Sequence, residues 1–124
     1  MWEKIMVDEV KEKITRHQQV LMQLLETYAA LLKPSNWLDV DNQVIADFER
    51  NHFLLVSVGW NKGVFRHSII FHFDIKPDGK IWLIANWTDV LIAEELLTMG
   101  VERMDIVVGF QPEELRPYSG FAVA

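Results

Sequence analysis

The chain has 124 residues, half of them apolar, and its 18 acidic and 12 basic side chains give a formal net charge of −6. This length predicts a single domain, residues 1–124, with a core large enough to fold without a metal or disulfide. The absence of cysteine excludes disulfide frameworks, cysteine zinc sites and thiol catalysis. The acidic balance argues against a protein that holds duplex DNA unaided. No apolar run is long enough for a membrane span, so we expect a cytoplasmic protein.

The first predicted element is a helix over residues 3–32, where apolar side chains recur at alternating steps of three and four. Such a helix spans about 45 Å, whereas a compact domain of this size has a radius of about 14 Å. We therefore expect its N-terminal half to project and to pair with a second copy of the chain. The alternative is a frayed or bent helix folded over its own sheet. The residues predicted at the dimer interface are Val7, Val10, Ile14 and His17.

Four strands are predicted next, because apolar and polar residues alternate between short turn sequences. They cover residues 40–48, 52–60, 64–75 and 80–85. Consecutive hairpins favour an antiparallel meander, and Gly63 is expected to supply a positive φ in the second turn. Alternation predicts Ile69 on the face of Phe71. Trp60 and Trp82 are expected to pack against the sheet.

The last third of the chain predicts a second helix, a short strand and an apolar tail. Thr88 is expected to cap the helix, which ends at Gly100. A strand follows over residues 105–108, then one helical turn at 112–115, and the apolar residues 121–124 should dock. The pattern predicts an α+β fold: a long N-terminal helix, a four-stranded antiparallel meander, a second helix, a short C-terminal strand and an apolar tail.

Two groups of side chains are candidates for sites of chemistry. Ser68, His72 and Asp74 share a predicted strand face, but same-face neighbours stand about 7 Å apart, too far for a nucleophile and its base. A polar outer face or a satisfied His–Asp pair explains them better. His52, His67 and His72 lie on neighbouring strands, yet the last two are five residues apart and are predicted on opposite faces. We therefore expect no metal site, no cofactor and no catalytic residue.

Nucleotide binding through a phosphate loop is excluded, because neither glycine-rich phosphate motif occurs. Basic side chains gather near two predicted hairpin turns, with Trp60 and Phe65 close by, and such a patch would suit contact with nucleic-acid phosphates. These basic residues are Lys62, Arg66, His67, Lys76 and Lys80. The acidic net charge makes direct nucleic-acid binding the less favoured interpretation.

The third and fourth predicted strands resemble a known family. Residues 71–76, Phe-His-Phe-Asp-Ile-Lys, and residues 78–82, Asp-Gly-Lys-Ile-Trp, are similar to the H-x-D-I-K-x-G-K-I-W core of the XisI family. This family comprises the fdxN element excision controlling factors of filamentous cyanobacteria. The similarity continues through Thr88-Asp89, residues 92–97, residues 105–110 and residues 121–124. Pro77 is an extra residue in the intervening turn, which changes only a hairpin tip.

The resemblance implies a role in controlling the programmed excision of a DNA element, together with a recombinase and a companion factor, XisH. It supplies no catalytic residues. We therefore expect a non-enzymatic accessory factor in DNA recombination that binds an XisH-type companion, with its acidic charge complementing a basic partner. The alternatives are a DNA-binding regulator that uses the basic hairpin edge, and a ligand-binding protein or enzyme with a site at His72, Asp74 and Arg116. The residues predicted for a partner or ligand surface are Trp60, Arg66, His72, Asp74, Arg116 and Tyr118.

Overall fold

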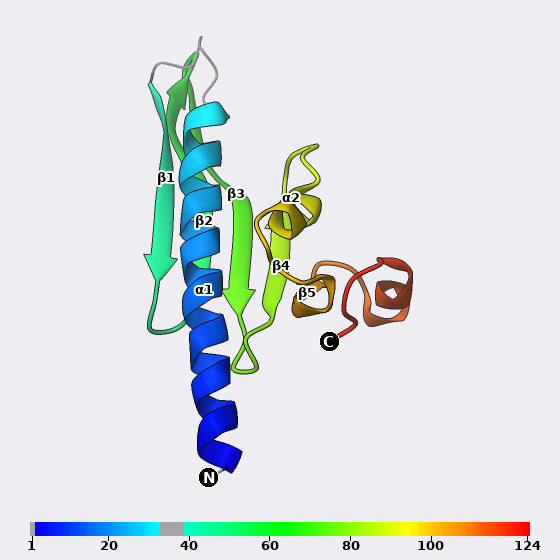
Figure 1. Ribbon diagram of the computed structural model, residues 1–124. Coiled ribbons are helices and arrows are strands. Elements are labelled where there is room, and N and C mark those ends of the chain that lie inside the picture. Colours follow the sequence, from blue (N-terminus) through cyan, green and yellow to red (C-terminus); the bar gives the residue numbers. More distant parts are fainter. Residues whose placement is uncertain (1, 33–38) are drawn as a thin grey trace.

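The computed structural model describes residues 2–32 and 39–124 and has the predicted α+β architecture (Figure 1). Its elements are α1 (Trp2–Leu31), β1 (Val40–Asp47), β2 (His52–Asn61), β3 (Val64–Ile75), β4 (Ile81–Asn86), α2 (Ile92–Thr98), the 3-10 helix η1 (Arg103–Asp105), β5 (Ile106–Val108) and the 3-10 helix η2 (Glu113–Tyr118). The bounds of α1 and of the five strands agree with the prediction to within one residue. No helix among the described residues is long and apolar enough to cross a membrane.

The sheet has the strand order β1-β2-β3-β4-β5. The first four strands form the antiparallel meander that the short turns predict. β5 pairs with β4 in parallel, because the chain passes through α2 before it returns to the sheet. The complete sheet is therefore mixed.

The β2–β3 hairpin turns at Lys62 and Gly63, whose φ angles are 50° and 79°. Positive φ at two successive turn residues is typical of a type I′ turn, whose twist matches that of the flanking strands. The predicted role of Gly63 is confirmed, and Lys62 adopts the same left-handed conformation. The tight turn sets the register of β2 and β3 from Asn61 back to Val56, where the register shifts by one residue.

The C-terminal half of α1 supplies one side of the hydrophobic core. Its apolar stripe buries Leu21, Leu24 and Leu25 against Phe53 and Phe71 of the sheet, and each of these side chains is at most 3% exposed. The helical spacing of three and four residues places the three leucines on one face. This packing holds α1 along β1, β2 and β3 (Figure 1).

The first turns of α1 project beyond the ends of the strands, as predicted (Figure 1). Ile5, Met6 and Val7 are 48%, 58% and 50% exposed. Two residues predicted at a dimer interface lie elsewhere: Ile14 packs against the chain's own core, and His17 is only 5% exposed. The part of α1 that is available to pair with a second chain is therefore shorter than the heptad pattern predicts.

His17 is buried where α1 meets the β3–β4 turn. Its Nδ1 lies 2.6 Å from the carbonyl oxygen of Gly79, so the neutral ring donates a hydrogen bond to that carbonyl. Burial lowers the pKa of His17 from its ordinary value; the Gly79 carbonyl and Asp105 oppose this effect, and Lys13 and Arg16 add to it. His17, which is predicted at the dimer interface, therefore links α1 to the sheet of its own chain.

α2 begins later than predicted. The Thr88 hydroxyl accepts a hydrogen bond from the backbone of Val90 and donates one to Asn86, and the helix starts only at Ile92. The prediction of Thr88 as the helix N-cap is wrong, because its side chain closes a turn that precedes the helix. The predicted end is confirmed: Gly100 has a φ of 93°, the left-handed conformation that commonly ends helices.

The C-terminal tail docks on β5, as predicted. The backbone N–H of Ala122 donates to the carbonyl oxygen of Ile106 at 2.8 Å, and Ala122 forms a parallel bridge with Val107. Phe121 and Ala122 are 9% and 6% exposed. The tail therefore covers a strand that would otherwise be an open edge of the sheet.

Candidate functional site

Within the described residues, α1 and α2 pack on the same face of the sheet, and no α-helix covers the opposite face, which we call the open face (Figure 1). On the open face, Arg116 of η2 lies against Trp82. β1 shows how the faces alternate. The Asn42 amide donates to the Ala29 carbonyl of α1 at 3.0 Å, so its neighbours Asp41 and Gln43 point to the open face. By strand register, the open face includes Ile45, His52, Leu54, Val56, Val58, Trp60, Phe65, His67, Ile69, His72, Asp74 and Trp82.

A β-bulge in β3 changes which side chains reach the open face. Leu55 pairs with Phe71, but the next residue, Val56, pairs with Ile69, so Ile70 has no register partner on β2. Ile69 is therefore on the open face and is 39% exposed. The prediction that Ile69 shares the buried face of Phe71 is wrong, because strict alternation fails at the extra residue.

The same bulge corrects the predicted faces of three polar residues. His67 pairs with Val58 and lies on the face of His72, so the predicted opposition of these two histidines is wrong. Ser68 and Arg66 turn toward the face that the helices cover. The serine therefore cannot join His72 in a catalytic set, and Arg66 lies apart from the other predicted surface residues.

The half of the open face nearest the β2–β3 turn, which we call the apolar half, carries exposed aromatic and aliphatic side chains beside Asp41, Gln43 and His67. The rings of Trp60 and Phe65 are in contact, with centroids 5.3 Å apart, and are 58% and 53% exposed. Ile69 is 39% exposed beside the buried Val56, and Ile45 is 49% exposed farther along the sheet, opposite Leu54 and level with His72. Trp60, which is expected both to pack against the sheet and to belong to a partner surface, packs on Phe65 of the sheet and leaves more than half of its side chain exposed on the open face. Exposed aromatic and aliphatic side chains grouped on one sheet face are typical of an interaction surface.

The other half of the open face holds a polar cluster. Register places His52 directly opposite Asp74, and His72 lies two residues before Asp74 on the same strand. The Nδ1 of His52 and the Nε2 of His72 lie 2.7 Å and 2.8 Å from one carboxylate oxygen, Oδ1 of Asp74. Burial raises the pKa of Asp74, but the hydrogen bonds to the two imidazoles outweigh burial and lower it overall. The expected His–Asp pair is confirmed, and His52 is its third member.

Trp82 lies beside this cluster and has two cations against its ring. It pairs with Asp74 across β3 and β4. The Nζ of Lys76 and the guanidinium carbon of Arg116 are 5.3 Å and 5.0 Å from the Trp82 ring centroid. Arg116 also donates to two backbone carbonyls near the C-terminus. The structure therefore brings Asp74 and Arg116 to one tryptophan that sequence reasoning did not select as a site residue, whereas Tyr118 is 86% exposed.

The two hairpin turns that carry the predicted basic residues lie at opposite ends of β3 (Figure 1). Lys62, Arg66 and His67 are at or near the β2–β3 turn. Lys76 and Lys80 flank the β3–β4 turn. The twelve residues of β3 separate these turns by about 40 Å. These side chains do not form one patch, so the predicted basic hairpin edge is wrong.

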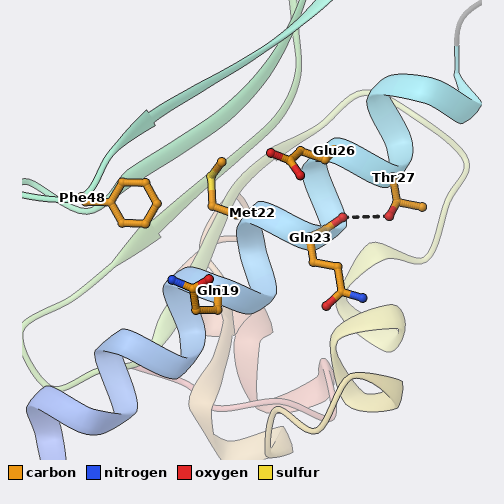
Figure 2. Close-up of a pocket in the computed structure, with 6 residues that line it drawn as sticks. All are labelled: Gln19, Met22, Gln23, Glu26, Thr27 and Phe48. Carbon is orange, nitrogen blue, oxygen red and sulfur yellow. Dashed lines mark hydrogen bonds between the residues drawn. The ribbon is translucent and has the colours of Figure 1, made fainter.

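A cavity of about 660 Å³ lies between α1 and the β1–β2 turn. Figure 2 shows its lining side chains, which are Gln19, Met22, Gln23, Glu26, Thr27 and Phe48. The Thr27 hydroxyl donates to the Gln23 backbone carbonyl at 2.8 Å, and Glu26 is the only ionisable group among these residues. This lining lacks a nucleophile with an adjacent base, and we therefore place the functional site on the open face.

Comparisons with known proteins agree with the resemblance in the sequence. A family model described as XisI protein matches residues 11–123. The chain is similar to the crystal structure of a XisI-like protein from Anabaena variabilis ATCC 29413, with 43% sequence identity and a TM-score of 0.81. It is also similar to the fdxN element excision controlling factor XisI from the same organism, with 28% identity and a TM-score of 0.75. Each alignment covers 90% of this chain and 99% of the other.

No curated protein matches the chain. The family match nevertheless spans all the strands, α2 and most of α1. It includes the whole open face and its polar cluster. The chain therefore belongs to the XisI family.

Proposed function

We propose that this protein is a non-enzymatic controlling factor that binds an XisH-type companion protein through the apolar half of its open face. The observation that carries this proposal is the exposure of Trp60, Phe65 and Ile69 on β2 and β3, where no α-helix of the described residues covers the open face. Exposed apolar area of this kind is stabilised when a partner removes it from water.

The composition of this patch supports a protein as its occupant. Trp60 and Phe65 supply two aromatic side chains in mutual contact, and aromatic residues are enriched among those that contribute most to protein–protein binding. Asp41 adds an exposed carboxylate on the same face. The net charge of −6 would steer the encounter with a basic, DNA-handling partner.

Two observations support a role without catalysis. One structural relative is named as an excision controlling factor, which is the name of a regulator. In addition, Ser68 and His72 lie on opposite faces of the sheet, so the Ser–His–acid set that the sequence contains is not assembled. DNA cleavage would then be the task of another protein.

The projecting turns of α1 support self-association as a second proposal. Three consecutive residues on an α-helix span about 200° of its circumference, and Ile5, Met6 and Val7 are all about half exposed. These residues precede the segment that the family model matches. Apolar residues recur along α1 at the steps of three and four that paired helices show, so we assign these residues to a contact with a second copy of this chain.

Co-purification with the companion tests the first proposal, with two exposed tryptophans as a matched pair. Trp60 is 58% exposed on the open face, and Trp87 is 80% exposed beside residues of the other face. The companion should co-purify with the wild type and with Trp87→Ser, and much less with Trp60→Ser. Equal recovery with both variants, or no recovery with the folded wild type, would contradict the proposal. A DNA mobility shift by the chain alone would favour the DNA-binding alternative.

Sedimentation tests the second proposal with a matched pair of valines. Val7 is 50% exposed on α1, and Val64 is 67% exposed at the β2–β3 turn. Val7→Asp should convert a dimer into a monomer, because the change places a charge in the helix contact. Val64→Asp should remain a dimer. A wild type that sediments as a monomer would exclude self-association.

A further inference from the structure

The polar cluster of the open face has the donor set and the convergence of a metal site. His52, His72 and Asp74 each offer one ligand atom, and these three atoms all lie within 4.8 Å of one another. The two imidazole nitrogens converge on the same carboxylate oxygen at 2.7 Å and 2.8 Å. We propose that His52, His72 and Asp74 bind one Zn²⁺ ion.

The backbone of the sheet fixes the positions of the three ligands. His52 and Asp74 are register partners on β2 and β3, and His72 is the same-face neighbour of Asp74 on β3. Ligands carried by paired strands are held more precisely than ligands on loops. The hairpin that joins the two strands turns at the other end of β2 and β3, and all three ligands lie within the paired strands.

The distances suit a zinc ion after a small adjustment. Bonds from Zn²⁺ to imidazole nitrogen and carboxylate oxygen of about 2.0–2.2 Å place the ligand atoms of a tetrahedral site about 3.3 Å apart. The present nitrogen–oxygen separations of 2.7 Å and 2.8 Å are hydrogen-bond distances. Small side-chain rotations that lengthen these two nitrogen–oxygen distances would admit the ion. The ion would replace the protons of the two hydrogen bonds.

The chemistry of the ligands selects the metal. Imidazole suits zinc and neighbouring transition metals, whereas Mg²⁺ and Ca²⁺ require several oxygen ligands. The cluster supplies one carboxylate, and Lys76 and Arg116 lie against the adjacent Trp82 ring. Mg²⁺ or Ca²⁺ would bind weakly to a site with one carboxylate and two nearby cations. The two imidazole nitrogens favour Zn²⁺ instead.

One coordination position would face water. The side chain of His52 is 49% exposed, whereas those of His72 and Asp74 are 24% and 16% exposed. Three protein ligands with solvent at the fourth position are the arrangement of zinc sites that accept an outside ligand. A bound zinc at this place could therefore also accept a side chain from a protein docked on the open face, which would link the metal to the proposed function.

Titration of the untagged protein with Zn²⁺ against a chromophoric chelator tests this site. The wild type should bind one Zn²⁺ per chain. His72→Gln and Asp74→Asn should each weaken binding at least tenfold. His67→Gln is the matched control, because it removes an imidazole from the same face of the same strand and should leave the affinity unchanged. A wild type without binding, or variants that bind as well as the control, would overturn the proposal.

A second measurement needs no variant. The chain contains four histidines, His17, His52, His67 and His72, so their ring nitrogens can be followed individually by NMR. Zn²⁺ should shift the nitrogen signals of His52 and His72 and leave those of His17 and His67 in place. Shifts at His67 alone, or equal small shifts at all exposed histidines, would show surface binding and contradict the site.

Discussion

His52 and Asp74 face each other directly across β2 and β3, with the imidazole Nδ1 2.7 Å from the carboxylate Oδ1. The same oxygen lies 2.8 Å from the Nε2 of His72. One carboxylate therefore serves two imidazoles, and it does so from a side chain that is only 16% exposed. The apolar patch and this polar cluster occupy the two halves of one uncovered face.

Asp74→Ala should destabilise the fold, because it leaves two imidazoles without their shared acceptor. We expect a loss of about 1–2 kcal/mol in the free energy of unfolding in metal-free buffer. Urea denaturation measures this loss. His67→Ala removes an exposed side chain from the same face and should change the free energy by less than about 0.5 kcal/mol. Equal stability of the two variants would show that the cluster contributes nothing.

Tyr28→Phe should loosen the contact between the two helices. The Tyr28 hydroxyl donates to Oε1 of Glu95 at 2.8 Å and is the side-chain hydrogen bond that joins α1 to α2 in the described residues. Its removal should cost about 0.5–1.5 kcal/mol, measured by urea denaturation. Glu95→Gln keeps an acceptor at the same place and should cost less. A larger loss for Glu95→Gln would assign another role to that carboxylate.

Gly59→Ala should destabilise the protein strongly. A Cβ at Gly59 would lie 2.0 Å from the carbonyl oxygen of Asp39, and the residue has a φ of 145°. We expect a loss of more than about 2 kcal/mol in thermal or urea unfolding. Gly63→Ala is the matched control, because its φ is 79° but nothing lies within 4 Å of the added carbon. It should cost only about 1 kcal/mol, and similar costs for both would contradict the close approach.

His17 predicts a pH dependence of stability. Its pKa is lowered in the folded protein, chiefly by burial, so below about pH 6.5 the unfolded chain binds a proton that the folded chain resists. Stability contributed by neutral His17 should therefore be complete above pH 6.5 and decline as the pH falls toward the folded-state pKa. Melting temperatures of the wild type and of His17→Gln between pH 8 and pH 5 measure this effect. The wild type should lose more stability than the variant, and parallel curves would contradict the prediction.

The sequence was sufficient for the elements that depend on local signals. Pro-Asp-Gly and Asn-Lys-Gly turns, strict alternation and a long apolar stripe predicted α1 and the meander. The bulge at Ile70 depends on pairing with β2, which local alternation does not encode, and it reversed the predicted faces of His67, Ser68 and Ile69. The parallel pairing of β5 likewise depends on a crossover.

The site was harder to predict than the fold. His72 and Asp74 could be paired from their spacing on one strand, but His52 joins them only through the register of a 10-residue strand with its neighbour. A hairpin alignment of β2 and β3 from their turn would have given the wrong partner, because the bulge shifts the register by one residue between the turn and the cluster.

The central claim is that a companion protein binds the apolar half of the open face. The most direct measurement is its affinity, by titration calorimetry, for two variants that each add one charge at an exposed aliphatic residue. Ile69 is 39% exposed on the open face, and Leu91 is 74% exposed just before α2. The account predicts at least tenfold weaker binding for Ile69→Asp, about 1.4 kcal/mol, and wild-type binding for Leu91→Asp. Equal affinity of the two folded variants would contradict it.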